Sequence, residues 1–249
     1  MGLFDFLFKK KPTFERIGNI EPVCPYCSIS LDKKPGRKKK CPSCGNFIYV
    51  RTSPINNQKI LVTEEQTIQL EEQWAIVNGT HDDFLAQRKA FESEKESLSK
   101  SLNREPTKEE IEYSQLNNSL AKHAKNTDWG LYRNARFGMA EILHKQGNKK
   151  SALNLFLEVC YFDLNGPSNM GGLQDPEILK EYPPFNTELA MLAPGVLGRV
   201  EKIVKELNIN SKEAFASFEP FAKHLHERLK LPVTPGKAWK KVEAEIWEP

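Results

Sequence analysis

The sequence has no long hydrophobic run, and this absence excludes one class of protein. A membrane-spanning helix needs about 18 or more consecutive, mainly apolar residues, and no stretch of this chain approaches that length. Hydrophobic residues make up 39% of the 249 residues and charged residues 28%, a balance typical of a protein with a substantial core. We therefore expect no transmembrane segment, and we expect the protein in the cytoplasm.

Patterns typical of enzymes are also missing. There is no glycine-rich phosphate-binding loop, and the five histidines are scattered along the chain. His224 and His226 are two residues apart in a predicted helix, so they point in different directions. His81-Asp82-Asp83 lies at a predicted helix start, where acidic side chains suit the helix dipole. Cys160 has no histidine near it and is interpreted as a small buried apolar residue. We therefore predict no enzymatic activity.

Cysteine is scarce, but four of the five cysteines form one pattern. Cys24-x2-Cys27 and Cys41-x2-Cys44 are two pairs with 13 residues between them. Two residues between cysteines let one tight turn aim both sulfurs at one point, and two such pairs are typical of a tetrahedral zinc site. We expect one structural Zn2+ ion, because four thiolates leave no open position for water or substrate. An iron site of the rubredoxin kind uses the same ligands, so the identity of the metal stays open.

The segment around these pairs resembles the zinc-ribbon family. The resemblance rests on Cys24-Pro-Tyr-Cys27, on Cys41-Pro-Ser-Cys44-Gly45 and on the strand-like run FIYVR at residues 47–51. It implies a three-stranded antiparallel unit over residues 21–53, and it implies almost nothing about function. A segment of about 30 residues cannot bury enough apolar surface to fold alone, so we expect metal binding to supply most of its folding free energy.

The ribbon sequence also predicts its backbone at particular positions. Gly45 suits the positive φ that a cysteine knuckle needs, and Ser28 fits the equivalent position less well. The Pro-Gly pair within Lys33–Arg37 predicts a type II turn. Residues 37–40 would then return as a strand into the second cysteine pair.

Positive charge is concentrated at the start of the chain. Residues 1–51 carry a formal net charge of +7, and residues 52–249 carry −4. Phosphate groups suit such a basic segment, and Tyr26, Phe47 or Tyr49 can stack on bases. A solvated face is the alternative, because lysine on an edge strand also blocks aggregation. The candidate phosphate contacts are Lys33, Lys34, Arg37, Lys38, Lys39, Lys40 and Arg51.

An apolar run followed by three lysines opens the chain. One interpretation is a short membrane-surface anchor or docking peptide, with peripheral membrane contact by residues 3–11. The other is a helical turn that packs on the same protein. We favour the second, because so short a segment offers little apolar area to a membrane.

Helical patterns dominate after Pro54, where strand character is predicted to end. Capping boxes at Thr63–Gln66 and Thr107–Glu110 predict two helix starts. The predicted division of the chain is an N-terminal segment (1–20), the zinc ribbon (21–53), a linker (54–62), a helical hairpin region (63–126) and an all-α domain (127–249) with an irregular loop at 164–186.

A weaker resemblance lies within residues 129–163. Small, large apolar, turn and aromatic residues follow the spacing of a tetratricopeptide repeat at Ala140, Leu143, Gly147, Ala152 and Phe156. One repeat cannot form a solenoid, so the resemblance implies only a helical hairpin of similar geometry.

These observations predict a small all-β zinc ribbon followed by a mainly α-helical domain of helical hairpins. We expect a non-enzymatic protein that binds DNA or RNA through residues 33–51 and a protein partner through its helical domain. The alternative is an adaptor, a scaffold for protein–protein contacts whose ribbon is a structural docking knob with no nucleic-acid binding. Apolar residues such as Leu3, Phe4 and Phe6 would then contribute to binding. The salt dependence of the affinity distinguishes nucleic-acid binding from the adaptor, because binding to phosphates weakens steeply as the salt concentration increases.

Overall fold

The computed structural model describes residues 13–169 and 175–247, and this part of the chain is mostly helical with a small antiparallel sheet near the N-terminus. The chain divides into two compact units, one ending at Glu92 and the other beginning at Ser93. The predicted contact of residues 3–11 with a membrane lies outside the described residues. Within those residues, no helix has both the length and the apolar character needed to cross a membrane.

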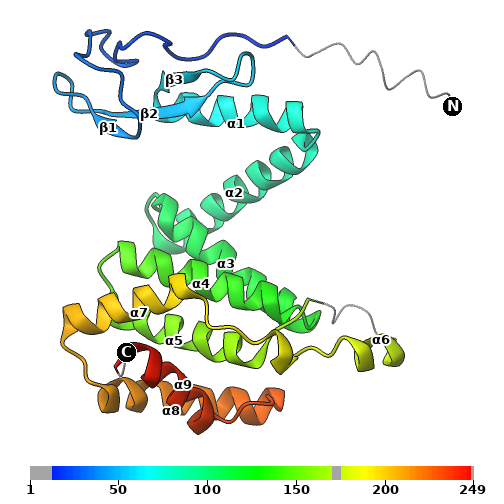
Figure 1. The fold of residues 1–249 in the computed structure, drawn as a ribbon. Helices are drawn as coiled ribbons and strands as arrows, with labels where there is room; N and C mark the ends of the chain where they lie inside the picture. Colours follow the sequence, from blue (N-terminus) through cyan, green and yellow to red (C-terminus); the bar gives the residue numbers. More distant parts are fainter. Residues whose placement is uncertain (1–12, 170–174, 248–249) are drawn as a thin grey trace, which may run out of the picture. The chain divides into compact units, whose positions relative to one another are not determined.

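The first unit is built on three antiparallel strands in the order β1-β2-β3 (Figure 1). The strands are β1 (Lys39–Lys40), β2 (Phe47–Thr52) and β3 (Lys59–Val62). The predicted end of strand character at Pro54 is wrong, because β3 follows it and occupies the second half of the predicted linker, 54–62. Asn19, before the first knuckle, forms an isolated bridge to Leu61 on the other edge of β3.

Helix α1 (Glu64–Asn78) follows β3 directly, and α2 (His81–Leu102) comes after it. The predicted capping box at the start of α1 is confirmed. Thr63 Oγ1 accepts a hydrogen bond from the Gln66 backbone N–H at 3.1 Å, and Gln66 Oε1 accepts one from the Thr63 N–H at 3.0 Å. Gly79 ends α1 with a φ of 71°. Helix α2 has no buried residue, and the boundary between the two units falls inside it.

Each face of the sheet carries a buried cluster, and Phe47 at the start of β2 stays exposed. On one face Ile48 and Leu61 pack beside the two buried cysteines. On the other face Ile60 and Val62 pack against Leu70 of α1, and Tyr49 is half-buried beside them. Because successive side chains of a strand point to opposite faces, β2 and β3 contribute to both clusters. Helix α1 therefore belongs to the same small fold as the cysteine knuckles.

The second unit is all-helical within its described residues, and α3 starts with the predicted capping box at Thr107–Glu110. After the end of α2 its elements are α3 (Lys108–Lys125), α4 (Trp129–Lys145), α5 (Lys149–Asn165), α6 (Pro176–Glu181), the 3-10 helix η1 (Thr187–Leu189), α7 (Pro194–Leu207), α8 (Ser211–Leu229) and α9 (Pro235–Ile246). The hairpin predicted around Gly147 is present, with α4 and α5 packed together on either side of it.

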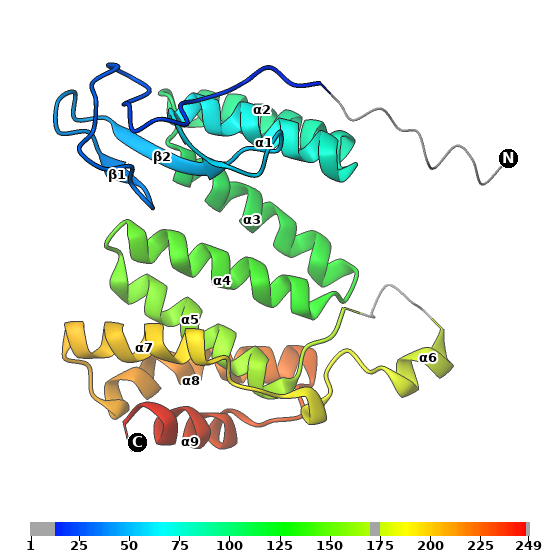
Figure 2. The same ribbon diagram turned by 45° about the horizontal axis from the view of Figure 1, so that its top comes forward.

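Helix α5 lies at the centre of this unit and packs against α4, α7, α8 and α9 (Figure 2). Its two buried acidic residues pair with arginines of α4. Arg133 donates two hydrogen bonds of 2.7 Å to the carboxylate of Asp163, and Arg136 Nε lies 2.9 Å from Glu158 Oε1. Burial raises the pKa of Glu158, while the charge of Arg136 opposes this increase. Removal of either partner would leave a buried charge uncompensated, so these pairs constrain how α4 and α5 associate.

Candidate metal centre and basic face

Four cysteine sulfurs lie close together in the first unit. The Sγ atoms of Cys24, Cys27, Cys41 and Cys44 all lie within 4.8 Å of one another. Cys24 Sγ is 3.9 Å from Cys44 Sγ, and Cys27 Sγ is 3.8 Å from Cys41 Sγ. A disulfide needs about 2.05 Å between sulfurs, whereas four sulfurs at about 2.3 Å from one tetrahedral ion lie about 3.8 Å apart. The cluster is therefore compatible with a pair of zinc-ribbon knuckles and can hold a metal ion.

The backbone of each knuckle turns through a residue with positive φ. The Ser28 N–H donates to the Cys24 carbonyl at 2.9 Å, and the Gly45 N–H donates to the Cys41 carbonyl at 3.0 Å. Gly45 has a φ of 73° and Ser28 a φ of 58°. The prediction for both positions is confirmed. Ser28 carries the greater backbone strain, because its Cβ is disfavoured in the left-handed region.

The two buried cysteines have different electrostatic surroundings. The backbone N–H of Cys44, helped by that of Ser43, lowers the pKa of the Cys41 thiol to about 6 against the effect of desolvation. Burial raises the pKa of Cys24 to about 11, although backbone N–H groups in its own knuckle oppose the increase. A cation bound among the sulfurs would favour the thiolate form of both. The donor set and its spacing thus fit a metal that binds four thiolates.

Tyr26, inside the first knuckle, connects the cysteine cluster to α1. Its hydroxyl oxygen accepts a hydrogen bond of 2.9 Å from the backbone N–H of Glu64, the first residue of α1. The sequence suggested Tyr26 only as a base-stacking residue. A contact between residues 38 positions apart leaves no local signal, so this role could not be predicted.

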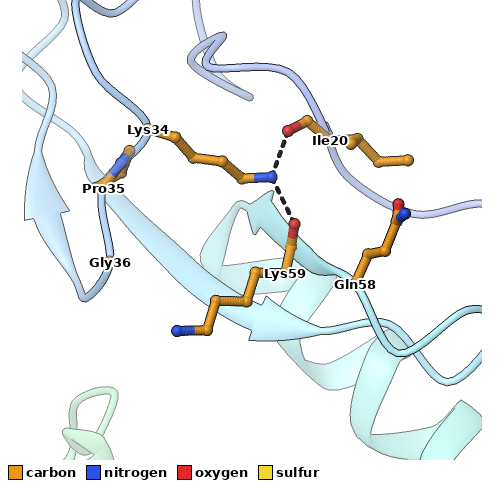
Figure 3. A pocket seen from close by; sticks show the side chains of 6 residues that line it. All are labelled: Ile20, Lys34, Pro35, Gly36, Gln58 and Lys59. Carbon is orange, nitrogen blue, oxygen red and sulfur yellow. Dashed lines mark hydrogen bonds between the residues drawn. The ribbon is translucent and has the colours of Figure 1, made fainter.

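Lys34, one of the predicted phosphate contacts, has its charged amine engaged within the fold. Its Nζ donates hydrogen bonds to the carbonyl oxygens of Ile20 and Lys59, the second at 2.6 Å. Figure 3 shows the amine between these two carbonyls. Lys34 therefore ties the segment before the first knuckle to β3. The surrounding open hollow is lined by Ile20, Lys34, Pro35, Gly36, Gln58 and Lys59.

The type II turn predicted within Lys33–Arg37 is wrong. That turn requires a positive φ at its glycine, and Gly36 is not among the positive-φ glycines of the described chain. The anchored amine of Lys34 holds this segment toward β3 instead, and only Lys39–Lys40 of the predicted return strand pair with β2.

The sheet gathers several other predicted residues on one side. Phe47, Tyr49 and Arg51 alternate along β2, and Lys40 lies opposite Phe47 in the register. Lys38 Nζ lies 4.5 Å from the ring centroids of both Phe47 and Tyr49. Lys40 Nζ lies 5.7 Å from the Phe47 ring, and Arg51 Cζ lies 5.6 Å from the Tyr49 ring. Phe47 is 46% exposed. We call these five residues the basic–aromatic face.

The remaining predicted phosphate contacts lie outside this face. Lys33 and Arg37 are exposed on the segment between the knuckles. Lys39 lies opposite the buried Ile48 in the register, so its side chain starts on the knuckle side of the sheet.

Cys160 and His81, for which the sequence predicted structural and not catalytic roles, have surroundings that fit such roles. Cys160 is completely buried in α5, as predicted, and burial raises its pKa far above the usual value. His81 Nε2 lies 3.1 Å from Glu72 Oε1, so the imidazole is directed at a carboxylate of α1.

A search of known protein families found no match for this chain, and neither did comparisons with curated proteins and with solved structures.

Proposed function

We propose that the chain is a non-enzymatic zinc-binding protein that binds nucleic acid through the basic–aromatic face of its first unit. Zinc is the ion we assign to the four cysteines, because an all-thiolate tetrahedral site suits it best among common metals. Its role is structural in this proposal. All four positions around the ion are sulfur, and two of the cysteines lie under the sheet with 0% and 3% exposure.

One observation carries the nucleic-acid part of the proposal. Three cationic side chains surround two aromatic rings on one side of a sheet, and Phe47 remains 46% exposed. Such a surface offers a ring to a base and a charge to the phosphate beside it. Single exposed apolar residues are common on protein surfaces, so the combination of two neighbouring rings with three cations, and not the exposure of Phe47 alone, supports a ligand.

An adaptor is the second candidate, and a feature of the helical unit favours it. Leu189, the last residue of η1, and Met191, in the segment between η1 and α7, are 68% and 70% exposed. Exposed apolar side chains that gather on one segment are typical of protein-binding surfaces. The α4–α5 hairpin, with its likeness to a tetratricopeptide repeat, would support that surface in this proposal.

Binding measured by fluorescence anisotropy over a series of salt concentrations tests the first proposal. The zinc-loaded full chain is titrated against labelled DNA and RNA, with a Lys38→Glu/Lys40→Glu variant beside it. A Lys237→Glu/Lys240→Glu variant in α9 is the matched control, because it changes the net charge equally through exposed lysines of the other unit.

The proposal expects affinity that falls with salt, with a log–log slope of about −2 for three contacts to a single strand. The Lys38/Lys40 variant should lose most of this slope, and the control should keep it. Equal weakening of both variants would contradict the proposal, because net charge alone would then explain binding. No binding to any nucleic acid would favour the adaptor, which a Leu189→Ser/Met191→Ser variant would test against candidate protein partners.

A further inference from the structure

We infer that the ligand of the basic–aromatic face is single-stranded nucleic acid, with unstacked bases lying on the rings of Phe47 and Tyr49. The inference rests on the proposed function and names its substrate class. Phe47 and Tyr49 are two residues apart on one strand, so they stand about 6.6 Å apart along it.

A ring face is useful only to a base whose own face is free. A duplex keeps its bases stacked and presents edges and phosphates to a protein, so it cannot use the exposed ring of Phe47. A single strand exposes the faces of its bases, and base–aromatic stacking accepts any base. Phe47, the most exposed aromatic residue of the basic–aromatic face, has no hydrogen-bonding group with which to read a base edge, so it can contact a base only through its ring.

The three cations lie around the two rings, where the phosphates of a nucleic-acid backbone beside stacked bases would be found. Lys38 Nζ lies 4.5 Å from both ring centroids, while Lys40 approaches only Phe47 and Arg51 only Tyr49. A nucleic-acid strand that runs along β2 would therefore meet a positive charge before, between and after the two rings. The phosphate between two stacked bases would draw Lys38 off the rings and free a face of Phe47 and the outer part of the half-buried Tyr49. An exposed cation–π contact is the weaker interaction, so stacking and an ion pair together would replace it.

The test uses three probes of equal length: a single strand, the corresponding duplex and a single strand with abasic sites. The abasic strand keeps the phosphates but has no bases to stack. The variant is Phe47→Leu, which removes the ring but keeps an apolar side chain at an exposed position outside the core. Tyr182→Leu is the control, because Tyr182 is a similarly exposed aromatic residue of the second unit. Metal content and circular dichroism establish that each variant is folded.

We expect the native chain to bind the single strand at least tenfold more tightly than the duplex. Phe47→Leu should weaken that binding about 5- to 150-fold, the range of one lost stacking interaction. Phe47→Leu and the native chain should bind the abasic strand with equal affinity, because that strand has no base that could stack on Phe47. Tyr182→Leu should change neither affinity.

Two outcomes would overturn the inference in distinguishable ways. If duplex binds as tightly as single strand and still depends on Lys38 and Lys40, the proposed function stands and the stacking inference fails. If neither form binds, both fail. An equal loss for normal and abasic strands in Phe47→Leu would also overturn the inference, since the ring would then support the face without contacting bases.

Discussion

Gly18 holds the segment before the first knuckle against β3, and replacing it with alanine should loosen the first unit. Gly18 has a φ of 75°, and an alanine Cβ there would lie 2.5 Å from Val62 Cγ1 and 2.6 Å from the Leu61 carbonyl oxygen. The left-handed backbone costs an L-residue about 1–2 kcal/mol. Overlap with packed atoms adds about 1–3 kcal/mol. The expected loss for Gly18→Ala is therefore about 2–5 kcal/mol.

Amide hydrogen exchange measures this loss at the bridge itself. The Asn19 N–H donates to the Leu61 carbonyl at 2.9 Å, and the Leu61 N–H returns a bond of 2.8 Å. A loss of at least 2 kcal/mol should speed exchange at both amides about 30-fold or more. Gly36→Ala is the control, because its added Cβ meets no atom within 4 Å. Exchange within threefold of the native rate would refute the steric reasoning, as would equal acceleration in both variants.

Three further predictions concern other parts of the molecule. Tyr26→Phe removes the hydrogen bond from the Glu64 N–H and should lower the stability of the first unit by about 1 kcal/mol. In a competition with a chelator, the apparent affinity of the chain for its metal should then fall roughly fivefold. A hydrogen bond from Arg104 is the main reason that the pKa of Glu110 falls from its usual 4.5 to about 2. The backbone amides at the start of α3 should therefore exchange their hydrogens faster as the pH falls through this range and Glu110 is protonated. Amide exchange in the first turn of α3 should show this, and Glu110→Gln should abolish the pH dependence. Removal of the metal should unfold the first unit but leave the second unit folded, with about a fifth of the helical circular dichroism lost, the share held by α1 and by α2 up to Glu92. A loss of half of that signal would contradict the independence of the units.

Local sequence patterns predicted the features that depend on near neighbours. The cysteine pairs converge as their spacing implied, since each knuckle is formed by five consecutive residues. The capping boxes at Thr63 and Thr107 are present because their partners lie three residues away. The positive φ at Gly45 was predictable for the same reason.

Features that depend on distant partners were missed. The strand β3 carries three buried residues in a row, because the knuckles cover one face of the sheet and α1 the other. Such a run lacks the alternation by which half-buried strands are recognised. The hydrogen bond from Lys34 to the Lys59 carbonyl spans 25 positions. Nothing near Lys34 in the sequence distinguishes this anchored lysine from its exposed neighbours.

A change of one residue in the length of β2 would move its side chains from one side of the sheet to the other. Its odd-numbered residues belong to the basic–aromatic face, and its even-numbered Ile48 and Val50 pack toward the knuckles. An insertion of one residue before Ile48 would reverse the side of each later residue of the strand, so that Tyr49 and Arg51 would point toward the knuckles and Ile48 and Val50 toward the basic–aromatic face. During evolution this strand should therefore keep its length. Related chains could be aligned on β2 and the cysteines even where the rest of their sequences has diverged.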